Sequence, residues 1–258
     1  MKIISWNVNG IRAVEKKNFV PWMQAEDADI VCLQETKARP EQLPKTLLEV
    51  TDVKGKPYHT CWASAKKAGY SGVAIYSKKK PENIRFLGVE EFDDEGRVIQ
   101  ADFKDLTVIS AYFPNSQDAG KRLDYKLRFC DAIMALCQEY RAQNRNFLLS
   151  GDYNIAHKPI DLARPDSNED SAGYLPEERA WMDSFTEAGF VDTFRHFHPE
   201  EIGHYSWWSY RGGARERNVG WRIDYHCMAN DFLKTVKSSV IRPEVLGSDH
   251  CPIEITIK

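Results

Sequence analysis

Eight short apolar runs are the feature that most restricts how this chain of 258 residues can fold. Each run is rich in Val, Ile, Phe and Tyr and is bounded by turn residues, which is the pattern of a buried β-strand. Because helical patterns lie between some of these runs, the sequence predicts a layered α/β protein whose sheets are not purely parallel. The predicted strands are Ile3–Val8, Asp29–Gln34, Ser71–Ser77, Val98–Phe103, Thr107–Phe113, Phe147–Ser150, Arg222–Ala229 and Cys251–Ile257.

Two stretches between the runs have the periodicity of amphipathic helices. Over Lys121–Tyr140, apolar residues recur at steps of three and four, and they include Cys130 and Cys137 on one helix face. A second helix is predicted to begin at Pro176, since proline suits a first helical turn, and to end at Gly189. Cysteines that share a helix face in this way are expected to pack in the core rather than to carry redox chemistry.

The composition narrows the class of protein further. No Gly/Ser-rich or Pro-rich linker divides the sequence, so we expect one domain over residues 1–258. No apolar run reaches the ~18 residues of a membrane span, and the six cysteines show no zinc-ligand spacing. With no secretory pattern at its N-terminus, the protein is expected to be cytoplasmic. The net charge of −3 argues against a generally basic nucleic-acid binder, so any contact with DNA must come from local patches.

Polar residues that can bind a metal ion or move a proton stand where the predicted strands end. Functional groups of layered α/β proteins gather on loops at one end of the strands, so we expect these residues to meet. Carboxylates together with amide oxygens suit a hard cation such as Mg²⁺ or Mn²⁺ rather than zinc. Since GxSxG, GxGxxG and GxxxxGK[ST] are all absent, metal-assisted hydrolysis of a phosphate ester remains. The residues are Asn7, Glu35, Tyr112, Asp152, Asn154, Asp249 and His250.

Each of these residues has an ordinary structural interpretation when it is taken alone. An isolated Glu35 is typical of a cap or a surface charge, and Asp249-His250 of a turn. Tyr112 would be a core aromatic residue, and Asp152 with Asn154 an Asx turn. The functional interpretation therefore depends on finding all of them in one sequence.

Six segments resemble the signature blocks of exonuclease III-type AP endonucleases, which are members of the endonuclease/exonuclease/phosphatase superfamily. The blocks occur in the family's order over nearly the whole chain, so they are far more specific together than any single motif. They are Ser5–Arg12 (SWNVNGIR), Leu33–Lys37 (LQETK), Tyr112–Asn115 (YFPN), Gly151–Asn154 (GDYN), Gly220–Tyr225 (GWRIDY) and Gly247–Pro252 (GSDHCP).

The resemblance implies a fold and an activity. The fold would be a four-layer α/β sandwich like that of deoxyribonuclease I, in which two packed mixed β-sheets are flanked by helices. The activity would be cleavage of duplex DNA on the 5′ side of an abasic site during base excision repair, leaving a 3′-hydroxyl and using one or two Mg²⁺ or Mn²⁺ ions. The resemblance further implies that the protein is a monomer and that it acts on duplex DNA with an abasic site or a blocked 3′ end. In a bacterium, the protein would be associated with the nucleoid.

The resemblance also assigns metal and proton-transfer roles. Asn7 and Glu35 match metal-site positions, with Asp249 close by, and Asp152 matches the residue that orients or deprotonates water. The alternative is that His250 is the general base, which would require a neutral imidazole. An Asp224–His250 pair would instead favour the protonated form, so we prefer Asp152 as the base. Asn154 matches the partner of this residue in the transition state.

The remaining matched positions concern the substrate. Tyr112 and Asn115 match residues that contact phosphate, while Trp207, Trp221 and Ile223 match the lining of a pocket for an extruded abasic sugar. If the segment around Trp207 is extended, Trp208 points the opposite way and is expected in the core.

Two local patches are candidates for DNA contact. The first contains seven lysines and no acidic residue, and it could track phosphates: Lys54, Lys56, Lys66, Lys67, Lys78, Lys79 and Lys80. The second interleaves aromatic residues with arginines, which suits contact with sugars and phosphates. It runs over Tyr205–Arg211 and continues to Arg215, Arg217 and Arg222.

Two rival functions stay open, and the sequence departs from the family at two places. A phosphoesterase of the same fold could act on inositol phosphates, a sphingolipid or RNA, and a DNA-binding module could keep the scaffold without catalysis. Asn9 stands where some family members carry Asp, and the loop Arg211–Arg215 is smaller than a bulky wedge would be. The sequence leaves the balance of endonuclease, 3′→5′ exonuclease and 3′-phosphatase activities open.

Overall fold

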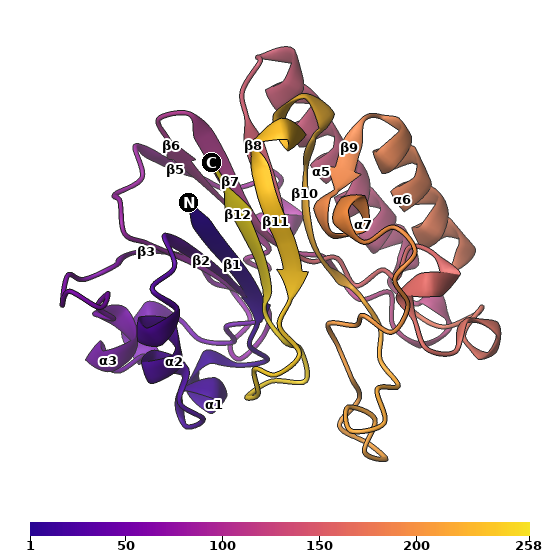
Figure 1. The fold of residues 1–258 in the computed structure, drawn as a ribbon, viewed down its shortest axis with the longest axis horizontal. Coiled ribbons are helices and arrows are strands. Elements are labelled where there is room, and N and C mark those ends of the chain that lie inside the picture. Colours follow the sequence, from indigo (N-terminus) through magenta and orange to yellow (C-terminus); the bar gives the residue numbers. More distant parts are fainter.

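Two six-stranded β-sheets pack face to face in the computed structural model, which describes residues 1–258 (Figure 1). The first sheet has the order β11-β12-β1-β2-β4-β3, and the second β5-β6-β7-β8-β10-β9. The strands of the first sheet are β1 (Lys2–Asn7), β2 (Ile30–Gln34), β3 (His59–Ala63), β4 (Val73–Ser77), β11 (Val236–Ile241) and β12 (Ile253–Ile257). Those of the second are β5 (Asn83–Arg85), β6 (Val98–Phe103), β7 (Leu106–Tyr112), β8 (Phe147–Asp152), β9 (Phe190–Asp192) and β10 (Asp224–Ala229).

Helices cover the outer face of each sheet. In Figure 1, α1 (Ile11–Glu15), α2 (Phe19–Glu26) and α3 (Lys45–Leu48) flank the first sheet, while α5 (Leu123–Ala142) and α6 (Pro176–Glu187) lie on the other side of the molecule against the second. Separate apolar clusters fill the two helix–sheet layers and the space between the sheets. Two shorter helices are α4 (Glu90–Asp93) and α7 (Thr193–Phe197). The expected four-layer α/β sandwich is thus confirmed, and no helix has both the length and the apolar character to cross a bilayer.

The strand directions explain why polar residues gather at one end of the sandwich. Strands β1 and β2 are parallel neighbours in the first sheet, and β7 and β8 are parallel neighbours in the second. The carboxyl ends of these parallel strands meet across the two sheets. The Asn7 amide at the end of β1 donates a hydrogen bond to Asp152 at the end of β8 over 2.8 Å. Side chains that follow strands of different sheets therefore reach one common rim.

All eight predicted strands are present with bounds shifted by no more than two residues, and four other strands were not predicted. Strands β5 and β9 have three residues each and lie at the edges of their sheet, and three residues are too few to give an alternating pattern. Strands β3 and β11 are edge strands as well. All six cysteines are free and buried, as the packing interpretation predicted.

Candidate active site

A cavity of about 540 Å³ opens at this rim, and every residue predicted from the sequence to belong to the site lines it or lies directly behind it. The residues directly behind the wall are Asn7, Asp152 and Asp224, which are almost fully buried. Each makes a hydrogen bond to a residue in the cavity wall. The lining residues that the sequence predicted are Glu35, Tyr112, Asn115, Asn154, Trp207, Trp221, Ile223, Asp249 and His250.

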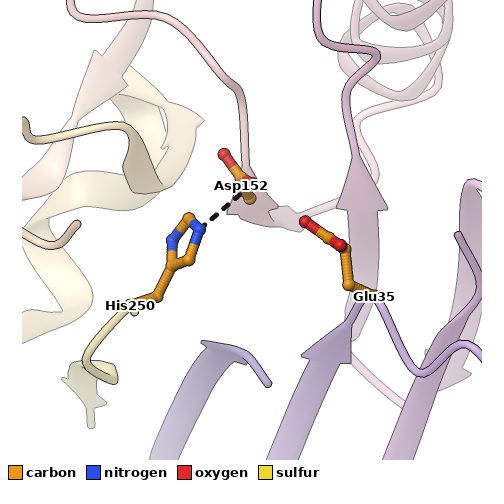
Figure 2. Close-up of side chains that lie close together, drawn as sticks. All are labelled: Glu35, Asp152 and His250. Atoms are coloured by element: carbon orange, nitrogen blue, oxygen red, sulfur yellow. Dashed lines mark ion pairs between the residues drawn. The ribbon is translucent and has the colours of Figure 1, made fainter. Parts of the chain in front are cut away.

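Three titratable side chains from distant parts of the chain converge at the floor of the cavity. Figure 2 shows Glu35, Asp152 and His250 pointing toward one another, and one ligand atom of each lies within 4.8 Å of the other two. The distance from His250 Nε2 to Asp152 Oδ2 is 3.9 Å. Glu35 directly follows β2 in a left-handed conformation with φ of 52°, which turns the chain out of the strand at the rim.

Amide groups hold the two carboxylates of this cluster in place. The Asn7 side-chain nitrogen donates to Glu35 Oε1 over 3.0 Å and to Asp152 Oδ2 over 2.8 Å. The backbone N–H of Asn154 donates to Asp152 Oδ1 over 2.8 Å, which a left-handed φ of 51° at Asn154 allows. Both carboxylate oxygens of Asp152, which is 1% exposed, are therefore held by hydrogen bonds.

His250 has the electrostatic environment of a cation. Its Nδ1 lies 2.9 Å from Asp224 Oδ2, and Ser206 donates to the same oxygen over 2.6 Å. Burial alone would lower the pKa of His250, but the carboxylates of Asp224 and Asp152 raise it to about 10. Burial also raises the pKa of Asp152 against the opposing effect of the His250 charge. The imidazole is thus a protonated donor near neutral pH rather than a base.

The other titratable groups of the cavity differ in charge. Burial would raise the pKa of Glu35, but Lys37, whose Nζ lies 2.7 Å from Glu35 Oε2, and Asn7 lower it overall. The pKa of Asp249 is also lowered, because the His250 charge and a hydrogen bond from Asn9 outweigh its burial. Burial raises the pKa of the Tyr112 phenol well above its usual value. The cavity thus contains two ionised carboxylates and a neutral phenol.

This donor set fits a hard divalent cation. Glu35, Asp152 and Asp249 supply carboxylate oxygens, and the cavity contains no cysteine. Oxygen-rich sets of this kind suit Mg²⁺ or Mn²⁺. The Asn7 amide nitrogen, not its oxygen, faces Glu35 and Asp152, so in this arrangement Asn7 acts as a hydrogen-bond donor.

An apolar slot adjoins the polar cluster. The rings of Trp207 and Trp221 are nearly perpendicular at 89°, with centroids 6.3 Å apart, and Ile223 packs beside them. Trp207 Nε1 donates to Asp249 Oδ2 over 3.1 Å, so the slot and the polar cluster share a wall. Trp208 is 3% exposed, which confirms its predicted place in the core.

Sequence reasoning missed the loops that complete the cavity. Asp118 and Ala119 follow β7, whereas the others form an irregular segment before α6, where no periodicity or motif marks a functional residue. The adjacent small residues Ser171, Ala172 and Gly173 are the one local sign of close backbone packing in that segment. The residues missed are Asp118, Ala119, Asn168, Asp170, Ser171, Ala172 and Gly173.

The lysine-rich patch predicted from the sequence does not form one surface. Lys66 and Lys67 lie in the loop before β4, near the rim, because Ser71 of that loop accepts a hydrogen bond from the Lys37 backbone. The other five lie at the opposite end of the first sheet, since Ser77 and His59 pair with each other far from Glu35. The expectation of one continuous surface for DNA was therefore wrong; the lysines at the far end are Lys54, Lys56, Lys78, Lys79 and Lys80.

The aromatic and arginine patch needs a similar correction. Arg222 is fully buried and pairs with Asp161 and Asp192 at 2.8 and 2.7 Å, so the expectation that it contacts a phosphate was wrong. Arg215 donates to backbone carbonyls, among them that of Ser248 over 3.0 Å, and so holds two loops together. The sequence alone did not separate these structural arginines from the exposed ones, because their burial depends on neighbours brought together by folding. The exposed ones are Arg211 and Arg217.

Comparisons with known proteins agree with this geometry. A family model described as the Endonuclease/Exonuclease/phosphatase family matches residues 4–250. The exodeoxyribonuclease of Bacillus subtilis (strain 168) is 45% identical over 259 residues, which cover 100% of this chain and 99% of the relative. The DNA-(apurinic or apyrimidinic site) endonuclease of Dictyostelium discoideum is 40% identical over 260 residues, covering 100% of this chain and 70% of the relative. Among solved structures, the AP endonuclease LMAP from Leishmania major aligns with a TM-score of 0.88 and 29% identity, covering 100% of this chain and 87% of that one.

Proposed function

Because the chain belongs to the endonuclease/exonuclease/phosphatase family, we propose that residues 1–258 form one catalytic domain of a DNA repair nuclease of the AP endonuclease and exodeoxyribonuclease class. Its substrate would be duplex DNA with an abasic site, cleaved at the phosphodiester on the 5′ side with Mg²⁺ or Mn²⁺. The observation that carries this proposal is the convergence of Glu35, Asp152 and His250 beside an apolar slot.

Glu35, Asp249 and Asn7 would hold the cation, with Asp152 near enough to share it or to help bind a second ion. When bound, the ion supplies positive charge that neutralises the phosphate and the developing charge of the leaving oxygen. For Asn7 to be a ligand, its amide would have to present the oxygen that now accepts the Asn9 backbone N–H over 3.0 Å. Lys37 would keep Glu35 ionised in either case.

Asp152 is the proposed general base. Its carboxylate takes a proton from a water molecule, whose oxygen forms a new bond to phosphorus while the bond from phosphorus to the 3′ oxygen breaks. The 3′ oxygen takes a proton from solvent and leaves as a hydroxyl, and the phosphate stays on the abasic sugar. Asp152 then returns its proton to solvent. Asn7 and Asn154 orient Asp152 for this step through their hydrogen bonds.

Four other residues would bind the phosphate. His250, held as a cation by Asp224, donates from Nε2 to a non-bridging oxygen. The neutral Tyr112 phenol and the Asn115 amide line the same cavity and can donate as well. The Asn115 nitrogen contacts Asn154 Oδ1 over 3.1 Å, which links phosphate binding to the group that orients Asp152.

The slot formed by Trp207, Trp221 and Ile223 would select the abasic nucleotide. A deoxyribose without a base can enter a slot walled by two indoles, whereas a complete nucleotide would collide with them. Extrusion from the duplex also costs least where base pairing is already lost. Shape and pairing thus favour the same substrate.

Replacement of Trp221 by alanine tests this slot. We expect Trp221→Ala to reduce the preference for abasic over intact duplex roughly tenfold, because the contact of an indole face with the sugar is lost. The Mg²⁺ concentration that gives half-maximal activity should stay the same, since Trp221 lies on the apolar side of the cavity. Trp62→Ala, which changes a partly buried indole on β3, is the matched control. An unchanged preference would remove the selectivity argument.

Product analysis on a duplex with one tetrahydrofuran abasic analogue tests the function itself. We expect one cut, with a 3′-hydroxyl on the upstream fragment and a 5′-phosphate on the downstream one, that EDTA abolishes and excess Mg²⁺ restores. Glu35→Ala should lose cleavage but retain binding to the abasic duplex, which a non-catalytic binding module would not predict. Faster hydrolysis of an inositol polyphosphate than of the duplex would overturn the proposal in favour of another phosphoesterase.

A further inference from the structure

A fully buried ion pair lies behind the cavity, outside the six segments that resemble the family blocks. Lys126 of α5 and Glu178 of α6 are both 0% exposed, and Lys126 Nζ lies 2.6 Å from Glu178 Oε1. Lysine and glutamate are almost never fully buried unless they are paired. Lys126 also donates to the backbone carbonyl of Asn154 over 2.6 Å, so the pair directly contacts a residue of the site.

Glu178 connects the pair to two further loops. Its Oε1 accepts a hydrogen bond from the Ser116 hydroxyl over 2.9 Å. Its Oε2 accepts from the backbone N–H groups of Gly173 over 2.7 Å and Leu175 over 3.0 Å. The carboxylate thus accepts four hydrogen bonds, one of them from Lys126, and every donor comes from a different position along the chain.

The three loops held in this way each supply part of the cavity. Asn115 precedes Ser116, Asn154 follows β8, and Gly173 lies in the segment before α6, and all three line the cavity. Gly173 packs so closely that an added Cβ would lie 3.1 Å from the Asn154 carbonyl oxygen and 3.4 Å from the Trp221 ring. The position of Gly173 therefore sets the spacing between Asn154 and one wall of the slot.

We propose that Lys126 and Glu178 are positioning residues for the nuclease reaction. This proposal rests on the function proposed above. They fix the Asn154 backbone, and through it the Asp152 carboxylate, together with the Gly173 wall of the slot. A buried ion pair adds little stability compared with apolar residues of the same size, because desolvation offsets the attraction. Its directional hydrogen bonds do specify one arrangement of the three loops, which is what a site built from loops requires.

The test must separate positioning from stability. Removing one charge leaves the other buried and unpaired, which strongly destabilises the fold, so single charge-deleting variants are unsuitable. The neutral double variant Lys126→Met with Glu178→Gln avoids this, although a glutamine nitrogen cannot accept a hydrogen bond from Gly173 or Leu175. Ser116→Ala is a milder second variant, which removes one hydroxyl donor and changes no charge.

Phe185→Leu is the matched control, because Phe185 is buried in the same helix as Glu178 but packs into the core away from the cavity. Single-turnover and steady-state cleavage of the abasic duplex are measured at least 20 °C below the unfolding midpoint of each variant. We expect kcat to fall at least tenfold in the double variant and about threefold in Ser116→Ala, with KM changed less than threefold and the control close to wild type.

Hydrogen exchange of the Gly173 and Leu175 amide protons is the second readout, because it does not depend on activity. Both should exchange faster in the double variant and stay protected in Phe185→Leu. An unchanged kcat in folded double and Ser116→Ala variants would overturn the proposal, as would an equal loss in the control. Failure of the wild-type protein to cut the duplex would count against the proposed function, while the exchange data would still test whether the pair holds these loops.

Discussion

Asp152→Asn is expected to reduce cleavage of abasic duplex by about 10²–10⁴-fold, the usual contribution of a general base. Asparagine has nearly the same shape and keeps one acceptor oxygen for the donors around Asp152, but an amide cannot take a proton from water. Its nitrogen cannot accept a hydrogen bond from Asn7 or Asn154 as the second carboxylate oxygen does. Binding of the duplex should remain within a few-fold of wild type, because Asp152 is 1% exposed and lies behind the cavity wall. Single-turnover kinetics with saturating enzyme isolate the chemical step.

The exposed Asp166 provides the control for this experiment, because Asp166→Asn removes the same charge in a loop outside the cavity. It should leave the rate unchanged. A loss of less than tenfold in Asp152→Asn would mean that another group accepts the proton. Since Asp224 still favours the cationic form of His250 in this variant, we would then look for a base among the remaining carboxylates.

His226 is expected to make the folded protein sensitive to mild acid. Its ring lies in β10 with Nδ1 2.8 Å from the Ser150 hydroxyl and Nε2 3.3 Å from the Ile253 carbonyl oxygen, and burial lowers the pKa of the imidazole from 6.5 to about 3. The unfolded chain therefore binds a proton below pH 6.5 that the folded protein excludes. Stability is complete above pH 6.5 and falls between pH 6.5 and 3, with a loss of about 2 kcal/mol at pH 5 from this residue.

Chemical denaturation at a series of pH values measures this effect. His226→Gln loses some stability at every pH, but the difference from wild type should shrink by about 2 kcal/mol between pH 7.5 and pH 5, because the variant has no ring to protonate. Thr60→Gln, on strand β3, changes no titratable group and should show a constant difference over the same range. A constant difference for His226→Gln as well would show that its ring titrates alike in both states.

The family blocks could be found in the sequence because each is local. Asn7, Glu35 and Asp152 stand directly at the ends of strands whose apolar pattern is strong, so both the strand and its functional end are visible in a few residues. The same holds for Asp249 and His250 before β12. Which of them touch could not be read in this way, because 145 residues separate Asn7 from the Asp152 carboxylate that it contacts.

The lysine run shows the opposite case. Lys66 and Lys78 are close in sequence and have the same charge, yet β4 carries the chain from one end of the sheet to the other between them. Arg222 likewise sits among slot residues but is directed inward, where it pairs with Asp161. Charge patterns predict surfaces only when the path of the backbone is known.

The sequence by itself thus determined the sandwich, its strands and the kinds of side chain at the site, since those depend on local pattern and on short blocks. The tertiary structure alone decided that Glu35, Asp152 and His250 lie within 4.8 Å of one another, and that Lys126 and Glu178 form a buried pair behind them. The physical reason is that burial, charge state and hydrogen bonding depend on neighbours brought together by folding. An isolated lysine or histidine in a sequence gives no sign of which partners will surround it.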